Sequence, residues 1–383
     1  MRLLIAAGFI GRFGETDGVV TTYQNLIPFF VKAGIKADFV AYGDQDNMEK
    51  WGSVRVFSHR PRCPIKIDPI RWVDPALMLS GKIRRLSSRK YDLVQCSTPE
   101  FMGLWALKIA RKNSSPMISL YHTALDQYAE IRTTQKFGKA CGKLTGRIVN
   151  RWLLHFFNQA RLVLAPSEAV RSQLLNFLSS DVNIIARGID GEKFNPAYRM
   201  RSDNKVRVIY VGRVAPEKNM QLLVKIFKTI SGAGLTVVGD GPYLPIMKRE
   251  LPNANFCGRL SGQLLSQAYA DGDIFVFPSH TDTFGNVVLE AMSSGLPVIV
   301  TDSLGPCEII DNGVDGFVTH SEEEFRDAVV KLIENPGLRR TMGRSARRAA
   351  ERRSWESIFE TLCGYYQTVL GTFPMPASAR KAI

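Results

Sequence analysis

The sequence predicts an α/β fold with two domains, each built around a parallel sheet. Strand-like apolar runs alternate with helix-like segments from the first residues onward, which is typical of βα units. Runs in the second half are continuously apolar, as in strands that are buried on both faces. The chain has 383 residues, which is more than one hydrophobic core usually holds. We therefore expect two α/β domains that face each other across a cleft.

The first half is expected to contain five strands and three helices. The strands are predicted at residues 2–7, 38–42, 91–96, 116–121 and 161–165, and the helices at 19–33, 101–111 and 169–177. The N-terminal run MRLLIAAGFI has one basic residue and no clear cleavage pattern behind it. We therefore interpret it as the first strand and not as a secretory signal.

A second series of strands begins after a short polar segment in the middle of the chain. These strands are predicted within the runs VRVIYVGR, LTVVGDG, IFVFPS and PVIVTD, and none is expected after Glu322. The boundary lies within residues 190–204, so we assign 1–195 to an N-terminal domain and 196–355 to a C-terminal domain. A last helix in residues 356–383 is expected to cross back to the first domain and to end in a mobile tail, TFPMPASARKAI.

The composition is that of a soluble globular protein with a basic surface. Hydrophobic residues make up 45% and charged residues 22%, which excludes disordered and fibrous classes, and no run approaches the ~20 apolar residues that cross a bilayer. The net charge of +14 favours anionic partners: phosphate-bearing substrates, anionic lipid surfaces or nucleic acid. The six cysteines form no CxxC pair, so neither a zinc site nor a disulfide framework is expected, and a reducing cytoplasm fits best.

Four glycines lie between the first strand and the first helix, at Gly8, Gly11, Gly14 and Gly18. Glycine permits close approach of the backbone to a phosphate or a sugar, so this loop is a candidate ligand site. The spacing is not GxGxxG, and the dinucleotide fingerprint is therefore absent. The alternative is a flexible loop without a ligand.

Two cations, Arg213 and Lys218, precede the helix-like run NMQLLVKIF, and Pro216 is expected near the first turn of that helix. Cations at this end oppose the helix dipole unless an anion lies between them, and a diphosphate would remove the conflict. The alternative is a pair of solvated charges, with Lys218 paired to Glu217 or to another acid.

Residues 275–302 contain a strand, an acidic loop, a helix and a second strand. Loops in this position bind ligands in α/β proteins, and the N-terminus of the following helix favours an anion such as phosphate. Asp282 lies in the loop, where an aspartate most often caps the helix. Glu290 stands out as a carboxylate inside an otherwise apolar helix.

Residues 131–151 contain six basic residues and no acidic one, and an aromatic and apolar run follows to residue 157. A basic helix of this kind can lie on an anionic membrane, so residues 131–157 are a candidate membrane contact. The alternative is an ordinary helix with a solvated basic face. A second basic cluster, residues 338–353, is expected to form a solvated helix face.

Several ordered motifs resemble those of the retaining glycosyltransferases of family 4, which have the GT-B fold. They are GRVAPEKNMQLLVKIF, VVGDGPY and PSHTDTFGNVVLEAMSSGLPVIVTD in the second half, and DGVVTTYQNL, YHT, LAPSEAV and RGIDGEKFNP in the first. The resemblance covers most of the chain. It implies two Rossmann-like domains, of which the first binds the acceptor and the second binds a nucleotide-diphosphate sugar.

The resemblance also implies roles for individual residues. Arg213 and Lys218 would neutralise the diphosphate as it becomes the leaving group, and Glu290 would bind the ribose hydroxyls. Asp282 would face the donor sugar, and His122 would contact that sugar near the reacting carbon. His122, Asp282, Arg213 and Lys218 would thus be catalytic. The other donor-binding positions that match the family are Gly18, Gly188, Thr283, Phe284, Gly285 and Asn286.

The chain departs from the family's pattern in two places. The family more often has glutamate where Asp282 stands, which shortens the reach to the sugar, and it has a Gly-Gly pair where this chain has Asp17 and Gly18. No Asp-x-Asp motif lies near a strand end to hold a metal. Arg213, Lys218 and a helix N-terminus would therefore carry the diphosphate, and transfer is expected to need no metal or other cofactor.

The leading hypothesis is a retaining hexosyltransferase of the mannose or glucose class that builds a cell-envelope glycolipid or polysaccharide. It would be cytoplasmic, or peripheral on the inner face of the membrane. The alternative is a sugar-nucleotide 2-epimerase of the same architecture, which would convert the donor without an acceptor. A basic nucleic-acid-binding module rests on charge alone, and since no RNA or DNA motif supports it, no nucleic-acid partner is expected.

Overall fold

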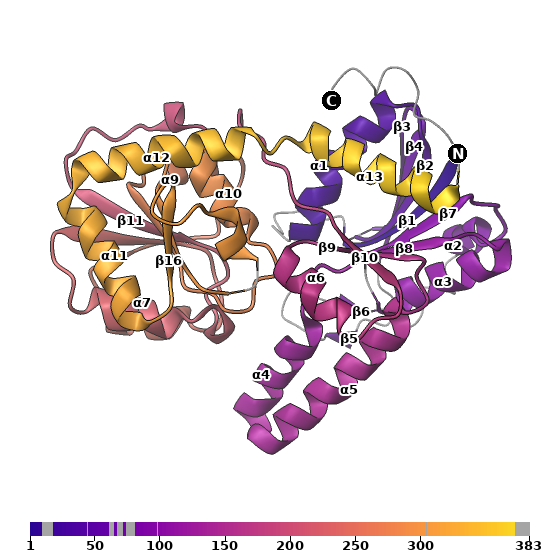
Figure 1. Cartoon of the computed structure of the whole chain (residues 1–383), viewed down its shortest axis with the longest axis horizontal. Coiled ribbons are helices and arrows are strands. Elements are labelled where there is room, and N and C mark those ends of the chain that lie inside the picture. The colour runs from indigo at the N-terminus through magenta and orange to yellow at the C-terminus, as the bar shows by residue number, and fades with distance from the viewer. Residues whose placement is uncertain are drawn as a thin grey trace. The chain divides into compact units, whose positions relative to one another are not determined.

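The computed structural model describes residues 1–9, 18–43, 45–60, 65–66, 72–73, 81–97, 99–303 and 305–371. The chain forms two compact units (Figure 1). The first consists of Met1–Asp126, Leu144–Ala186 and Trp355–Ile383, and the second of Gln127–Lys143 and Arg187–Ser354. Most of the expected glycine loop, residues 10–17, and the expected mobile tail, residues 372–383, lie outside the described residues.

The first unit is built on an eight-stranded sheet in the order β10-β9-β8-β7-β1-β2-β4-β3. Its strands are β1 (Arg2–Phe9), β2 (Lys36–Tyr42), β3 (Asn47–Trp51), β4 (Val54–His59), β7 (Leu93–Cys96), β8 (Met117–Leu120), β9 (Leu162–Ala165) and β10 (Asp181–Ile184). Neighbouring strands are parallel except β3, which pairs antiparallel with β4. The strands β5 (Ile65–Lys66) and β6 (Trp72–Val73) form a separate pair.

Three strands of this sheet, β3, β4 and β10, were absent from the sequence prediction. Strand β3 is largely exposed, and only one residue of β10 is fully buried, so neither has the apolar run on which the prediction relied. Strand β4 alternates between buried and partly exposed positions. The expectation of an entirely parallel sheet was wrong at this edge, because β3 and β4 form an antiparallel pair.

Three helices of the first part of the chain match those predicted at residues 19–33, 101–111 and 169–177, and two long helices follow each other without a strand between them. The helices of this part are α1 (Gly18–Lys32), α2 (Gly81–Leu86), α3 (Phe101–Asn113), α4 (Leu125–Phe137), α5 (Lys139–Phe157) and α6 (Glu168–Leu175). No helix in the described ranges is both long enough and apolar enough to span a bilayer.

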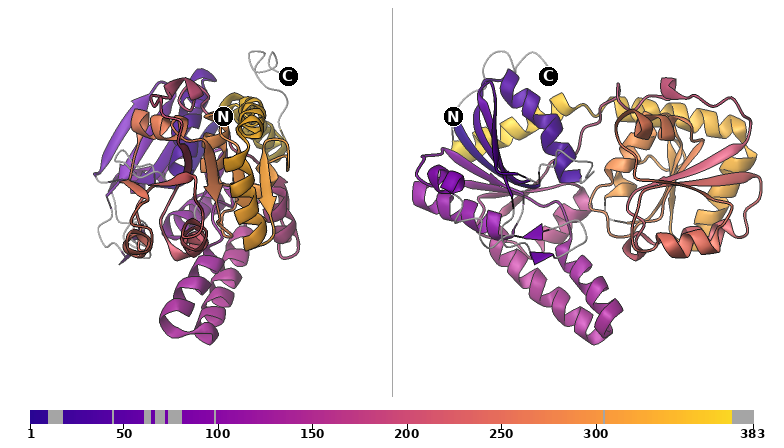
Figure 2. Two further views of the ribbon diagram at one scale, coloured as in Figure 1. Left: turned by 90° about the vertical axis from the view of Figure 1, so that its left-hand side faces the viewer. Right: turned by 180° about the vertical axis from the view of Figure 1, so that it is seen from behind.

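Helix α13 (Trp355–Leu370) completes the core of the first unit and lies beside α1 (Figure 2). Phe359 packs edge-on against Phe30, with ring centroids 5.0 Å apart. The hydroxyl of Tyr366 donates to Oε1 of Gln95 on β7, and Nε2 of Gln95 donates to the Tyr23 hydroxyl on α1 at 2.8 Å. A chain of buried hydrogen bonds therefore joins α13, the sheet and α1, and buried polar groups need such partners.

The second unit is built on a six-stranded parallel sheet in the order β13-β12-β11-β14-β15-β16. Its strands are β11 (Val206–Val211), β12 (Ala233–Val238), β13 (Asn255–Gly258), β14 (Ile274–Phe277), β15 (Val298–Thr301) and β16 (Gly316–Thr319). Because all six strands are parallel, their carboxyl ends share one edge of the sheet, the carboxyl edge, and their amino ends share the opposite one, the amino edge.

Four of these strands match the four predicted apolar runs, and the two outermost strands were missed. Strands β13 and β16 have four residues each and are partly exposed, which is typical of sheet edges. The helices of this unit are α7 (Met220–Phe227), α8 (Leu244–Glu250), α9 (Gly262–Ala270), α10 (Asn286–Ser293), α11 (Glu322–Glu334) and α12 (Pro336–Glu351).

The division between the units falls after Ala186 and not after residue 195, because the segment that follows is bonded into the second unit. Arg347 on α12 donates to the carbonyl oxygens of Gly191 at 3.2 Å and Phe194 at 2.7 Å. The expectation of a solvated face for residues 338–353 is therefore wrong at Arg347, which also donates to the carbonyl of Ser293 at 2.5 Å. Residues 127–143, expected in the N-terminal domain, group with the second unit.

Candidate active site

Two loops at the carboxyl edge of the second unit are held backbone to backbone. The amide of Gly212 donates to the carbonyl of Val238 at 3.0 Å, and the amide of Val214 donates to the carbonyl of Asp240, also at 3.0 Å. A Cβ atom at Gly239 would lie 1.8 Å from the carbonyl oxygen of Gly212, which no side chain can tolerate. The backbone conformations of the motifs GRV (212–214) and GDG (239–241) therefore depend on each other.

Arg213 lies in the first of these loops and is paired with a buried carboxylate. Its Nη1 atom is 3.3 Å from Oε1 of Glu217, whose side chain is 5% exposed. The Tyr210 hydroxyl donates to the backbone carbonyl of Arg213 at 2.8 Å. The guanidinium group thus has a fixed backbone and a fixed counter-ion.

Lys218 forms an ion pair with Asp282, a residue of the loop after β14. Its Nζ atom lies 2.7 Å from Oδ2 of Asp282 and donates to the Tyr128 hydroxyl at 3.3 Å. Burial acts to lower the pKa of Lys218, but Asp282 and Tyr128 outweigh it, so the pKa lies above its ordinary value. The predicted alternative of a pair between Lys218 and Glu217 is wrong. Its second form, a pair between Lys218 and another acid, agrees with the structure, in which that acid is Asp282.

The turn that carries Lys218 is separate from the helix that follows it. Pro216 begins a short 3₁₀ turn, Pro216–Lys218, and Asn219 then adopts the left-handed conformation with φ 55° before α7 begins. The prediction of a proline near the first turn of the helix agrees with this arrangement, since Pro216 lies four residues before Met220, the first residue of α7. The 3₁₀ turn and the left-handed Asn219 therefore separate Lys218 from the first residue of α7.

The loop after β14 has buried side chains and is hydrogen-bonded to the turn that carries Lys218. Thr283 and Phe284 are buried, and Thr281 donates from Oγ1 to the carbonyl of Glu217 at 3.2 Å. Gly285, with φ 95°, is the residue that caps α10, so Asp282 is not the cap. Asp282 is free of that role and turns its carboxylate to Lys218. Asn286 is the first residue of α10.

Glu290 lies on the second turn of α10 and has a tyrosine partner that the sequence analysis missed. The Tyr269 hydroxyl on α9 donates to Oε2 of Glu290 at 2.8 Å. Burial raises the pKa of Glu290 above its ordinary value, and the bond from Tyr269 and the charge of Lys193 partly oppose that shift. Tyr269 is itself packed edge-on against Phe194, with centroids 5.6 Å apart. Nothing in the sequence of α9 marks this tyrosine.

The predicted site residues are divided between the two units. Arg213, Lys218 and Asp282 lie in loops at the carboxyl edge of one sheet, with Glu290 on the helix that follows. The second unit also contains Gly188, which is buried. The first unit contains the other two. His122 follows the carboxyl end of β8 and is partly exposed, and Gly18 is the first residue of α1.

The second unit therefore offers two cations, each beside a carboxylate, and a further carboxylate with a hydroxyl partner. Cations of this kind suit a phosphate-bearing ligand, and carboxylates suit its hydroxyl groups. Two family models match adjoining parts of the chain. Residues 16–193 match Glycosyltransferase Family 4, and residues 194–349 match Glycosyl transferases group 1.

Full-length relatives and solved structures agree with these matches. The sulfoquinovosyl transferase SQD2 of Arabidopsis thaliana is 32% identical over 366 residues, which cover 90% of this chain and 69% of that protein. A GDP-mannose-dependent alpha-mannosyltransferase of Mycobacterium tuberculosis (strain CDC 1551 / Oshkosh) is 33% identical over 300 residues, 76% of each.

A solved structure with the same fold is the sucrose-phosphate synthase from Thermosynechococcus elongatus, with a TM-score of 0.77 at 18% identity, covering 97% of this chain and 99% of that one. This likeness and the two parallel-sheet units confirm the predicted GT-B fold class. With the matches to the relatives, the chain belongs to glycosyltransferase family 4.

Proposed function

We propose that this glycosyltransferase moves a hexose of the mannose or glucose class from a nucleotide-diphosphate sugar to a cell-envelope acceptor, with retention of configuration and without a metal. The observation that carries the proposal is the ion pair of Lys218 and Asp282 at 2.7 Å. This ion pair joins Lys218, the predicted contact of the diphosphate, to Asp282, the predicted contact of the donor sugar. Arg213, in the same unit and at the same edge, supplies a second cation.

In the proposed reaction, the bond between the anomeric carbon and the diphosphate oxygen breaks, and its electron pair leaves with the nucleoside diphosphate. Arg213 and Lys218 stabilise the charge that develops on this leaving group. The oxygen of an acceptor hydroxyl forms the new bond to the anomeric carbon, and its proton is released. Retention requires the new bond to form on the face from which the diphosphate departs.

Asp282 has two roles in this proposal. Before the donor binds, its carboxylate neutralises Lys218, whose side chain is only 9% exposed, and a buried lone ammonium would be costly. When the diphosphate takes over Lys218, the carboxylate becomes available to a hydroxyl of the donor sugar. Glu290 accepts hydroxyls of the ribose. His122 and Gly18 of the first unit, and Gly188, Thr283, Phe284, Gly285 and Asn286 of the second, complete the proposed contacts.

A donor panel tests the proposal. The protein is incubated with UDP-, GDP- and ADP-hexoses, and its unfolding temperature and the release of nucleoside diphosphate are measured. One donor class is expected to raise the unfolding temperature and to be consumed faster when a lipid-linked or glycan acceptor is added. A donor that is converted to an isomer of equal mass without an acceptor would instead identify a 2-epimerase.

We propose that the acceptor lies at an anionic membrane. In this proposal the protein is cytoplasmic and binds peripherally to the inner face of that membrane. The support is a row of exposed apolar residues on α5. Leu144, Ile148 and Trp152 are four residues apart and therefore share one side of the helix; they are 60%, 62% and 38% exposed. A second row with the same spacing is basic and consists of Lys139, Lys143, Arg147 and Arg151. Such a pair of rows suits the boundary of lipid headgroups and acyl chains.

Co-sedimentation with phosphatidylcholine vesicles, with and without phosphatidylglycerol, tests the membrane contact. Leu144→Ser with Ile148→Ser is expected to weaken binding by about tenfold, because less apolar area enters the bilayer. The control is Leu175→Ser with Leu264→Ser, two leucines exposed on other helices. Equal binding of all three proteins would contradict the proposal, as would an equal loss in both variants.

A further inference from the structure

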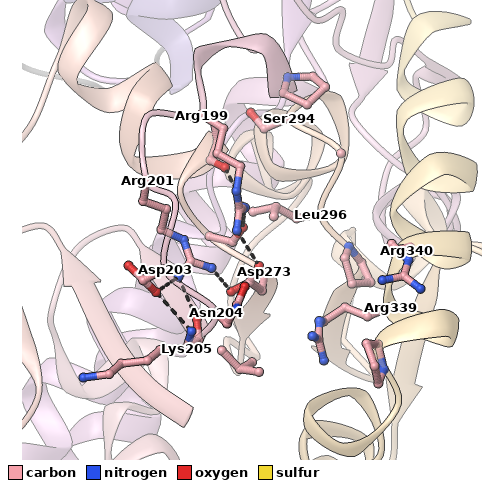
Figure 3. A pocket seen from close by; sticks show the side chains of 17 residues that line it. Arg199, Arg201, Asp203, Asn204, Lys205, Asp273, Ser294, Leu296, Arg339 and Arg340 are labelled. Carbon is pink, nitrogen blue, oxygen red and sulfur yellow. Dashed lines mark hydrogen bonds and ion pairs between the residues drawn. The ribbon is translucent and has the colours of Figure 1, made fainter.

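A second concave site lies at the amino edge of the second unit's sheet (Figure 3). The pocket has a volume of about 390 Å³ and is lined by the segment before β11, by the ends of α9 and α10, and by the start of α12. Its size is in the range of small-molecule sites. The expected donor loops follow the strands, whereas this lining precedes them, so the pocket is separate from the candidate active site.

The lining of this pocket is strongly basic. Four arginines contribute to it: Arg199 and Arg201 from the segment before β11, and Arg339 and Arg340 from α12. Figure 3 shows the two pairs on opposite sides of the pocket. Arginine is the residue best suited to planar, bidentate recognition of phosphate and carboxylate groups.

Two carboxylates also line the pocket, and both are already engaged. Asp273 accepts from Nη2 of Arg199 at 3.0 Å and from Nη2 of Arg201. Asp203 accepts from Nη1 of Arg201 at 2.7 Å. Both carboxylates thus bind the arginines on one side of the pocket.

The arginines on the other side have no such partner. Within the described ranges, neither Arg339 nor Arg340 forms an ion pair with a carboxylate, and the hydrogen bonds of Arg339 go to two carbonyls at the end of α11. Burial lowers the pKa of Arg339, Asp273 opposes that shift, and Arg340, Arg201 and Arg199 add to it. The guanidinium groups of Arg339 and Arg340 therefore add to the positive charge of the pocket, whose acids are bonded to the opposite arginine pair.

We propose that this pocket binds a small, multiply charged phosphate compound between the two arginine pairs. Arg340 is exposed and lies on the rim, so it is the direct contact of the ligand. Arg339, held by the end of α11, supplies a second charge. Because the pocket opens at the amino edge, its occupant takes no part in the transfer and acts as an effector or a structural anion.

Pyrophosphate is the probe, and titration calorimetry at constant ionic strength is the measurement. The background is Lys218→Ala, which impairs the expected diphosphate site at the carboxyl edge. In this background, pyrophosphate is expected to bind at one site, and Arg340→Glu is expected to weaken it by about tenfold or more. The control is Arg344→Glu, which makes the same charge change one turn along α12 at another exposed position.

Each result bears on the proposal separately from the transfer reaction. Loss of binding in Arg340→Glu but not in Arg344→Glu supports it, provided that both variants keep the unfolding temperature of the parent. No binding in the parent, or an equal effect of the two substitutions, overturns it. The second variant Arg339→Gln, with a smaller loss expected, separates a site between the arginine pairs from binding to Arg340 alone.

Discussion

The two edges of the second unit's sheet hold their positive charges in different ways. At the carboxyl edge Asp282 pairs with Lys218, and Glu217 lies 3.3 Å from Arg213 and 3.9 Å from Arg132. At the amino edge Asp273 serves two arginines and also accepts the backbone amide of Arg207 at 2.8 Å. The acids of the carboxyl edge therefore pair with side-chain cations, whereas Asp273 at the amino edge also holds the backbone of β11 in place.

The largest expected effect is at the carboxyl edge. Lys218→Ala is expected to lower kcat/KM for transfer by about 100- to 1000-fold, because a positioned charge on the leaving group is lost. Arg213→Ala is expected to act in the same direction. The measurement is initial rate against donor concentration, with the unfolding temperature as a control of folding. Normal turnover in both variants would sink the assignment of this edge to the diphosphate.

The next effect concerns the loops that hold these cations. Gly239→Ala is expected to destabilise the second unit by about 3 kcal/mol, because its Cβ would lie 1.8 Å from the carbonyl of Gly212 at a φ of 141°. The matched control is Gly234→Ala on β12, the strand that Gly239 follows, where nothing lies within 4 Å of the added carbon. Denaturant unfolding measures both. Equal stability of the two variants would show that the loops can separate at little cost.

A smaller effect is expected at the amino edge. Asp273→Asn is expected to lower the free energy of unfolding by about 2 kcal/mol, since Arg201, whose side chain is 7% exposed, loses one of its two carboxylates. The exposed Asp203→Asn should lower the free energy of unfolding by less than Asp273→Asn does. Donor binding should be unchanged in both. Loss of donor binding in a folded Asp273→Asn protein would break the distinction between the two edges.

The smallest effect concerns Glu290 and is visible through pH. Because burial raises its pKa in the folded state above the ordinary 4.5, the fold favours the protonated form. Its ionisation therefore costs stability, and this cost appears as the pH rises from 4.5 through the raised pKa. Glu290→Gln should remove the cost, so its gain over the parent should be greater at pH 8 than at pH 4.5. The control is Glu192→Gln, which makes the same substitution at an exposed position.

Much of the fold was predictable, because buried parallel strands appear in the sequence as continuous apolar runs. Strands β11, β12, β14 and β15 are of this kind, and all four were found. Edge strands are half exposed and short, so β3, β13 and β16 carry no such signal. The division after Ala186 was missed because it depends on hydrogen bonds from Arg347, 156 residues away from Gly191.

The residues of the candidate site were predictable from the sequence, but their interaction partners were not. Arg213 and Lys218 were found because two cations before a helix are electrostatically unusual. Their partners were not, because Asp282 is 64 residues from Lys218 and only the folded sheet brings them together. Tyr269 was missed for the same reason, since it reaches Glu290 across 21 residues. The roles carried over from the family remain predictions for the donor panel to decide.

Helix α13 has a consequence for the order in which the protein is made. The core of the first unit includes Trp355, Phe359 and Tyr366, which leave the ribosome after the whole second unit has been synthesised. The N-terminal half emerges first, but part of its apolar surface remains uncovered until the last helix has been synthesised. The second unit, although it starts later, has all of its strands available sooner. A nascent chain stopped before Trp355 therefore presents a complete second unit beside an unfinished first one.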